Sequence, residues 1–121
     1  MGKGSDMTTQ GTTGRRERLE EALSKAVQVL AEKYKPERVV LFGSLATGDV
    51  NETSDLDLLI VKDTPLPFFE RLREVALLCR LDVGADLLVY TPGEVELALR
   101  ENRFFREEIL GKGREVYRAS S

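Results

Sequence analysis

The spacing of hydrophobic residues predicts several helices along this chain. Between Arg15 and Tyr34, apolar residues recur at intervals of three and four, as on an amphipathic helix, and Pro36 follows its expected end. The same spacing predicts a helix over Phe68–Leu81 and a short one around Phe104–Leu110. A further helix begins at Thr91-Pro92-Gly93-Glu94, which combines an N-cap residue, a proline at the first helical position and a capping-box glutamate.

Runs rich in β-branched, leucine and aromatic residues predict short strands between these helices. They cover Arg38–Phe42, Asp55–Val61 and Ala85–Tyr90, and Glu115–Tyr117 is a candidate last strand. Apolar residues fall on both faces of Asp55–Val61, as in a strand that is covered on both sides. We therefore predict one small α/β or α+β domain over residues 15–118, with a short helical turn and a loop between the first two strands.

Composition narrows the class of protein. The chain has 121 residues, of which 41% are hydrophobic and 32% charged, as in ordinary globular domains. Residues 1–14, MGKGSDMTTQGTTG, carry no periodic apolar signal, and we interpret them as a disordered tail or a cloning remnant. No apolar run approaches the roughly 18 residues of a membrane span, and the start of the chain lacks a signal-peptide pattern. We expect a cytoplasmic protein without a membrane partner.

The residue types that are absent limit the chemistry. The chain has no histidine, which excludes Ser-His-Asp and Cys-His catalysis and every histidine-ligated metal site. Its single cysteine, Cys79, excludes an internal disulfide and a thiolate zinc cluster, and its helical position predicts a core residue. A net charge of −3 argues against a large nucleic-acid footprint. Catalysis would have to use carboxylates, hydroxyls, backbone amides, lysine or arginine.

Three aspartates open predicted strands. Asp55 and Asp57 are two residues apart, so on a strand both side chains point to the same face. Neighbouring carboxylates repel each other unless a cation lies between them, and Mg²⁺ binds a couple of carboxylates together with waters and substrate phosphates. Asp86 brings a third carboxylate to the same edge if its strand pairs beside the second. The alternative for Asp55 and Asp57 is that they lie at a solvated strand end and bind nothing. The alternative for Asp86 is that Asp82, four residues earlier, takes its place.

Gly43-Ser44 follows the first predicted strand directly. Glycine lets the backbone approach a ligand closely, and the next amides lie where a helical turn begins, which favours an anion. Ser44 adds a hydroxyl donor. Alone, this dipeptide is more typical of an ordinary strand-to-turn junction. Together with the carboxylates, it predicts a nucleoside triphosphate pocket for phosphoryl or nucleotidyl transfer.

These residues resemble a known signature. Phe42-Gly43-Ser44, ten further residues, and then Asp55-Leu56-Asp57-Leu58 are similar to the motif of the DNA polymerase β-like nucleotidyltransferase superfamily. The small size and the run from Asp86 to Pro92 resemble its minimal nucleotidyltransferase (MNT) branch, of which many members are encoded beside a HEPN-domain protein as toxin–antitoxin pairs. The resemblance implies a single nucleotidyltransferase-like domain with a mixed sheet flanked by helices.

The resemblance also implies roles for the individual residues. Gly43 and Ser44 would hold the β- and γ-phosphates of ATP, the nucleotide donor. Asp55 and Asp57 would bind two Mg²⁺ ions, and Asp86 would bind the catalytic metal and help to activate an acceptor hydroxyl for attack on the α-phosphate. Many members carry arginines where this chain has residues 45–47, Leu-Ala-Thr, and a nearby cation such as Lys62 is a candidate replacement.

Two hypotheses follow for the function. The first is a Mg²⁺-dependent transferase that moves AMP from ATP to a hydroxyl, on a partner HEPN toxin by analogy with the family. The second is an antitoxin that acts only by binding, with a decayed nucleotide site. A third interpretation is a free-standing transferase that acts on a small alcohol. A second copy of the chain, in a homo-oligomer, is a further candidate partner. Phe104 and Phe105 are interpreted as core residues, with a partner-binding patch as the alternative.

Overall fold

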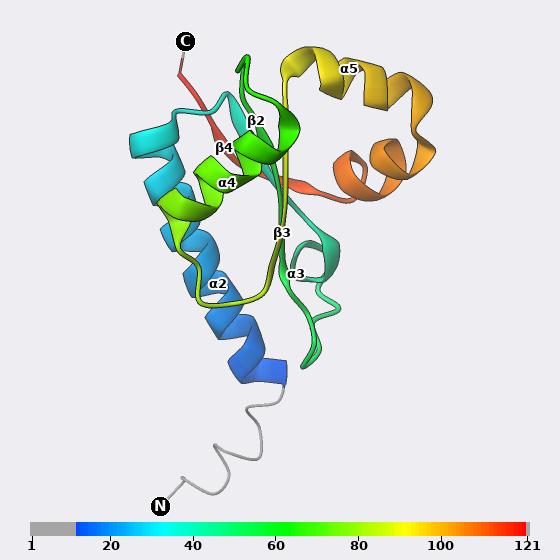
Figure 1. Cartoon of the computed structure of the whole chain (residues 1–121). Helices are drawn as coiled ribbons and strands as arrows, with labels where there is room; N and C mark the ends of the chain where they lie inside the picture. Colours follow the sequence, from blue (N-terminus) through cyan, green and yellow to red (C-terminus); the bar gives the residue numbers. More distant parts are fainter. Residues whose placement is uncertain (1–11, 121) are drawn as a thin grey trace, which may run out of the picture.

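A four-stranded mixed sheet forms the centre of the computed structural model, which describes residues 12–120 (Figure 1). The strands lie in the order β3-β2-β1-β4, and their bounds are Arg38–Phe42 (β1), Leu56–Val61 (β2), Ala85–Tyr90 (β3) and Arg114–Arg118 (β4). β1 pairs antiparallel with β2 and β4, whereas β2 and β3 run parallel. This confirms the predicted α/β fold with a mixed sheet.

Helices cover both faces of this sheet (Figure 1). On one face lie α2 (Thr12–Val29), its continuation as the π-helix η1 (Leu30–Tyr34), and α4 (Phe68–Cys79). On the other face lie α5 (Pro92–Glu101) and the π-helix η2 (Phe105–Leu110). The five-residue helix α3 (Gly43–Thr47) follows β1 directly. Within the described residues, no helix is long and apolar enough to cross a membrane.

β2, like its neighbour β1, is buried by both layers. Its Leu58 and Ile60 belong to the core beneath α2 and α4, and its Leu59 and Val61 belong to the core beneath α5 and η2. This explains the continuous apolar run LLIV at residues 58–61, because a strand that is covered on both faces needs apolar side chains at successive positions.

The predicted boundaries differ slightly from the observed ones at the start of the chain. α2 begins at Thr12, inside the predicted tail over residues 1–14, and the rest of that tail, residues 1–11, lies outside the described residues.

The capping box at α5 is confirmed. The Thr91 hydroxyl accepts a hydrogen bond from the Glu94 amide (3.2 Å), and a Glu94 carboxylate oxygen accepts one from the Thr91 amide (2.8 Å). Cys79 is buried, as predicted.

Candidate active site

Asp57 and Asp86 are neighbours across the parallel pair β2–β3. They occupy directly paired register positions, so their side chains project from the same face of the sheet. Asp57 also pairs with Phe42, the last residue of β1, and Gly43 follows. Both carboxylates line a pocket of about 390 Å³. Its other lining residues are Phe42, Gly43, Thr47, Asp49, Phe104, Glu108 and Lys112.

Gly43 determines how closely the backbone approaches Asp57. Its φ of +74° lies in the left-handed region, which favours glycine, and a Cβ atom at this position would overlap the Asp57 carboxylate. The helix α3 begins at Gly43, and Phe42, its N-cap residue, provides no side-chain hydrogen bond to the first turn. Gly43 therefore serves both the turn out of β1 and the contact with the carboxylate.

The surroundings of Asp57 disfavour its ionised form. Burial, and then the charges of Asp86 and Asp55, raise the pKa of Asp57 to about 6. A cation between Asp57 and Asp86 would remove this repulsion, and oxygen ligands of this kind are the ones that Mg²⁺ prefers. Among the described residues, no three acidic or cysteine side chains already converge as a metal site. Asp57 and Asp86 thus fit a Mg²⁺ ion whose remaining ligands come from substrate oxygens and water.

The structure does not bring Asp55 and Ser44 into the pocket lining. Asp55 precedes β2, and its side chain is about half exposed (52%), with a carboxylate oxygen 3.7 Å from an Arg15 guanidinium nitrogen and against the Cα of Gly84. Asp55 is still close enough for its charge to raise the pKa of Asp57. Ser44 lies in α3, where its carbonyl oxygen accepts hydrogen bonds from the Gly48 and Asp49 amides (2.8 and 3.0 Å). Asp57, Asp86 and Gly43 are the predicted site residues that the structure brings together.

A second wall of the pocket comes from the chain around η2. Phe104, Glu108 and Lys112 follow one another at intervals of four residues and all face the carboxylates. The Lys112 ammonium group lies 3.0 Å from a Glu108 carboxylate oxygen. The two adjacent phenylalanines differ: Phe105 is 1% exposed and part of the core, whereas Phe104 is 62% exposed at the pocket. Sequence reasoning missed Glu108 and Lys112, whose only signal was this spacing.

The prediction that Lys62 serves the site is wrong. Lys62 follows β2 at the end opposite to Asp57, where its ammonium group donates to the Tyr34 carbonyl (2.6 Å) and lies 4.9 Å from the centroid of the Tyr34 ring. The cation that lines the carboxylate pocket is Lys112. Arg16, from the start of α2, also approaches this region, since it donates to the Gly48 carbonyl (3.0 Å).

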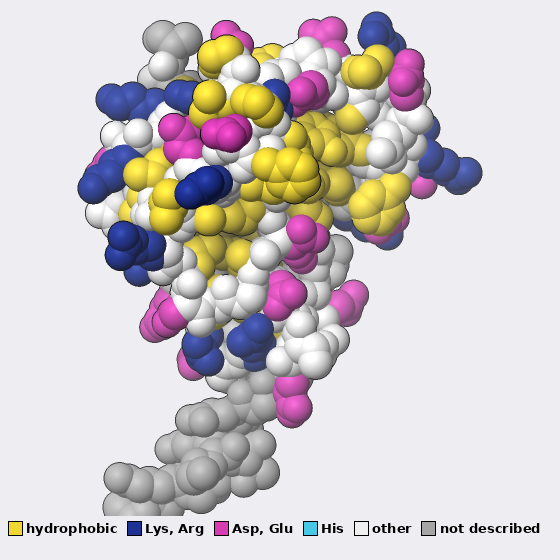
Figure 2. Space-filling view, viewed as in Figure 1, with side chains coloured by type: hydrophobic (Ala, Val, Ile, Leu, Met, Phe, Trp, Pro, Cys, Tyr) yellow, Lys and Arg dark blue, Asp and Glu magenta, His cyan; other side chains and the backbone are white. Residues whose placement is uncertain are grey.

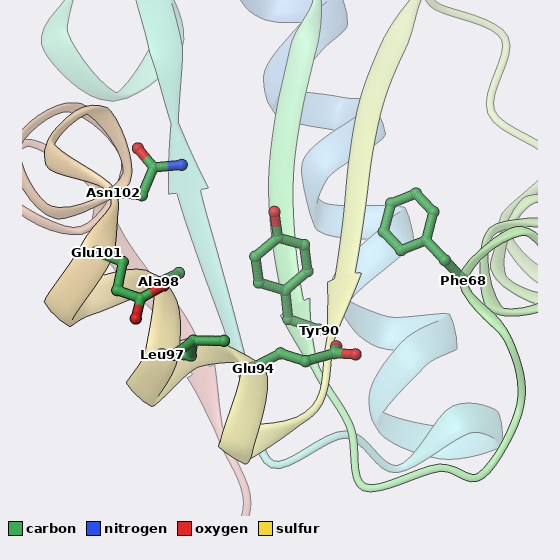
Figure 3. A pocket seen from close by; sticks show the side chains of 7 residues that line it. All are labelled: Phe68, Tyr90, Glu94, Leu97, Ala98, Glu101 and Asn102. Atoms are coloured by element: carbon green, nitrogen blue, oxygen red, sulfur yellow. The ribbon is translucent and has the colours of Figure 1, made fainter.

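A second hollow, of about 490 Å³, lies at the other end of β3 (Figure 3). Phe68 stands on one side of Tyr90, and α5 provides the opposite wall with Leu97 and Glu101. The lining of this hollow mixes apolar and polar side chains, and its Glu94 carboxylate is already paired with the buried Arg71 (2.7 Å). The carboxylate pocket is therefore the better candidate for chemistry, although it is the smaller of the two.

Comparisons with known proteins show the family to which the chain belongs. The model of the family described as "Nucleotidyltransferase domain" matches residues 23–117. A "putative protein adenylyltransferase" of Methanocaldococcus jannaschii is 31% identical over 100 residues, which are 81% of this chain and 97% of that protein. The crystal structure of a "putative nucleotidyltransferase" from Sulfolobus solfataricus superposes with a TM-score of 0.55 at 28% identity, over 68% of this chain and 75% of that one.

One further likeness concerns the fold alone. A chain in the crystal structure of a toxin–antitoxin with AMP-PNP superposes with a TM-score of 0.53 at 20% identity, and the match covers 80% of this chain and 73% of that one. The family match and the Methanocaldococcus relative confirm the resemblance to minimal nucleotidyltransferases that the sequence indicated.

Proposed function

This chain belongs to the nucleotidyltransferase domain family, and we propose that it transfers AMP from ATP to a hydroxyl group on a partner protein in a Mg²⁺-dependent reaction. The observation that carries the proposal is the pairing of Asp57 with Asp86 beside Gly43 in one pocket. Paired carboxylates of this kind suit a metal-bound triphosphate, and an adjacent glycine turn leaves room for its phosphates.

Each residue has a definite part in the proposed reaction. Asp57 and Asp86 would hold the metal, with Asp55 nearby, and Mg²⁺ would supply charge neutralisation on the phosphates. Gly43 lets the triphosphate lie against the backbone, with the Ser44 hydroxyl as a further donor, and the Lys112 ammonium group attracts the pyrophosphate. The acceptor hydroxyl attacks the α-phosphorus, its proton passes to Asp86, and pyrophosphate leaves as the bond to the α-phosphorus breaks.

The proposed acceptor is a toxin of the HEPN class, for which this chain would act as antitoxin. Two likenesses support a protein acceptor: the Methanocaldococcus relative has the name of a protein adenylyltransferase, and the fold matches a chain of a toxin–antitoxin crystal structure. On this proposal, modification of a hydroxyl on the toxin is the event that neutralises it.

Label transfer tests the proposal. The chain is incubated with Mg²⁺ and a lysate of the source organism, once with ATP labelled at the α-phosphate and once with ATP labelled at the γ-phosphate. We expect a discrete protein band that carries only the α-label and is lost in Asp86→Asn. The matched control is Asp82→Asn, because Asp82 is exposed on the loop before β3 and is the acid that sequence alone could have favoured instead. Transfer that is equal in both variants contradicts the proposed role of Asp86.

A binding-only antitoxin is the second candidate, and two observations favour it. Residues 45–47 lack arginine, and within residues 12–120 no three-carboxylate cluster is already assembled. This candidate predicts that a partner is retained in a pull-down but receives no label, and that Mg²⁺-ATP leaves the melting temperature unchanged. Label confined to a small molecule would instead indicate a free-standing transferase.

A further inference from the structure

β3 lies at the edge of the sheet, and within residues 12–120 no strand pairs with one side of its backbone. The Leu56 amide donates to the Gly84 carbonyl and the Lys62 amide to the Tyr90 carbonyl, both at 2.9 Å. Since backbone groups alternate in direction along a strand, the even-numbered residues of β3 face β2. The amide and carbonyl groups of Ala85, Leu87 and Val89 consequently face away from the sheet.

Among the residues that the structure describes, a side-chain hydrogen bond covers the half of this edge near Tyr90. The buried Arg71 donates to the Val89 carbonyl (3.1 Å), which closes the edge near Tyr90. No other strand of the described residues pairs with Ala85 or Leu87 on the outer side, and Ala85 is exposed. Figure 2 shows acidic side chains directly beneath the hydrophobic area around β3 on this side of the molecule. The open half of the edge is thus the half that carries Asp86.

The position of Asp86 on this edge is what makes the open half useful. A chain that adds antiparallel to β3 would form hydrogen-bonded pairs with Ala85 and Leu87, and it would place one residue opposite Asp86 in a non-hydrogen-bonded pair. In such pairs the Cα atoms are only about 4.5 Å apart and both side chains lie on the same face. That face is the one on which Asp86 lies beside Asp57 and the pocket.

The opposite face of the edge offers room for apolar side chains. A pocket of about 290 Å³ is lined there by residues of α4, the following loop and β3, namely Ala76, Cys79, Arg80, Leu81, Val83, Ala85 and Leu87. The neighbours of the residue opposite Asp86 would point into this pocket, because side chains alternate between the two faces of a strand. The aspartates at this end of the sheet repel acidic segments, so charge favours a neutral or basic one.

We propose that the acceptor reaches the active site as an extended protein segment that adds to the sheet at the open half of β3, with its hydroxyl residue opposite Asp86 and an apolar residue on each side. This inference rests on the proposed nucleotidyl transfer and specifies its acceptor. The segment's hydroxyl oxygen forms the new bond to the α-phosphorus, the hydroxyl proton passes to Asp86, and the bond between the α-phosphorus and the departing pyrophosphate breaks.

The test uses a designed peptide as the probe, Arg-Gln-Val-Xaa-Val-Gln-Arg, in which Xaa is Tyr, Ser or Thr and no other residue carries a hydroxyl, with Phe at Xaa as the blank. The peptides are incubated with the full chain, Mg²⁺ and ATP labelled at the α-phosphate. We expect label on at least one hydroxyl peptide and none on the Phe peptide. N-methylation of a valine beside Xaa, which blocks a hydrogen bond to β3, should reduce transfer at least tenfold. N-methylation of Xaa itself, whose N–H points away from β3, is the matched control and should change transfer less than threefold.

A change in the protein provides a second arm. Ala85→Pro removes an outward N–H donor at the first residue of an edge strand, a position where proline is tolerated. We expect this variant to lose transfer to the peptide while the rise in melting temperature with Mg²⁺-ATP persists, which shows that the fold and the nucleotide site are intact.

The outcomes separate this inference from the proposed function. Equal transfer to both N-methylated peptides, or full transfer by Ala85→Pro, overturns the edge-strand inference and leaves nucleotidyl transfer standing. A wild-type chain that is stabilised by Mg²⁺-ATP but labels no peptide also overturns it, because the edge then does not suffice to seat an acceptor. If the wild-type chain is a dimer that Ala85→Pro converts to a monomer, a second copy of the chain occupies the edge, which also overturns the inference. If Mg²⁺-ATP at millimolar concentration does not stabilise the wild-type chain, the proposed function itself is contradicted.

Discussion

Asp57 is the residue on which the site depends, because it touches Gly43, pairs with Asp86 and has a raised pKa. The sequence predicted that Gly43 and Asp57 would contribute to one pocket, and that Asp86 would join them if its strand paired beside β2, which it does. Asp55 was harder to place, because it lies before β2 and outside the alternation that fixes side-chain direction within a strand. Lys62 was misplaced because it is near Asp57 in sequence but not in space. The two residues are five positions apart along an extended strand, which corresponds to roughly 16 Å.

The raised pKa predicts that Asp57→Asn stabilises the metal-free protein. Protonation of Asp57 is easier in the folded state, with a pKa of about 6, than in the unfolded state, near 3.8. The stability that the folded state gains from this easier protonation is therefore complete below about pH 3.8, and it is lost as the pH rises through 6. Measured by thermal unfolding in EDTA, the variant should gain a few degrees in Tm at pH 7.5, since about 1 kcal/mol corresponds to roughly 4–8 °C in a domain of this size. The gain should vanish near pH 4.

The control for this change is Asp63→Asn, which removes an exposed carboxylate from the loop after β2. Its Tm should stay within about 1–2 °C of wild type across the same pH range. A wild-type Tm at pH 7.5 that equals or exceeds that of Asp57→Asn contradicts the proposed burial and repulsion at Asp57.

Two glycines with positive φ provide a matched test of the contact with Asp57. Gly48→Ala meets no atom within 4 Å, so its cost is the left-handed backbone alone (φ +94°), about 1–2 kcal/mol. Gly43→Ala has a similar φ of +74° and in addition forces the Asp57 carboxylate aside. Urea denaturation should show a larger loss of stability for Gly43→Ala, by at least about 1 kcal/mol, together with lost Mg²⁺-ATP binding. Equal losses in the two variants argue against the close contact.

At the scale of elements, one buried arginine joins α4, β3 and α5. Arg71 of α4 forms two hydrogen bonds to the Glu94 carboxylate (2.7 and 3.2 Å) and donates to the Leu66 carbonyl (2.7 Å) and the Val89 carbonyl (3.1 Å). The hydrogen bond from Arg71 holds the pKa of Glu94 below its ordinary value, so this pair contributes to stability at neutral pH and the contribution is lost as Glu94 protonates in acid.

We therefore expect Arg71→Met to destabilise the chain by about 2–3 kcal/mol in urea denaturation at pH 7. Arg73→Met, an exposed change two residues further along α4, should cost less than about 0.5 kcal/mol. The difference in stability between the two variants should narrow at acidic pH, and the part that remains belongs to the hydrogen bonds from Arg71 to the Leu66 and Val89 carbonyls. A loss for Arg71→Met that persists unchanged in acid would assign its role to packing instead of to the pair with Glu94.

The segment around η2 supplies the cation of the pocket. Lys112→Met should weaken Mg²⁺-ATP binding about tenfold, which corresponds to roughly 1.4 kcal/mol, as measured by calorimetric titration. Lys62→Met removes a cation at the opposite end of β2 and should leave the affinity unchanged. Glu108→Gln frees Lys112 from its ion pair and should keep or increase the affinity. Lost binding in Lys62→Met, or unchanged binding in Lys112→Met, contradicts this assignment.

At the scale of the whole molecule, the fold was largely predictable because hydrophobic spacing and covered faces agree. A strand with apolar residues on both faces requires a layer of helices on each side, and this is the observed arrangement. The packing of η2 over the strand ends was not predictable, because nothing local indicates which end of the sheet a short helix will cover. For this reason the sequence revealed the carboxylate wall of the pocket but not the wall formed by Phe104, Glu108 and Lys112.

The central claim is that Asp57 and Asp86 form a site for a metal-bound nucleotide. Calorimetric titration of the wild-type chain with ATP, first in Mg²⁺ and then in EDTA, tests it most directly, with Asp57→Asn, Asp86→Asn and the control Asp63→Asn titrated in parallel. We predict saturable binding in Mg²⁺ that weakens at least tenfold in EDTA and in the first two variants, and is unchanged in the control. Binding that is equally strong without Mg²⁺, or in both site variants, would contradict the account.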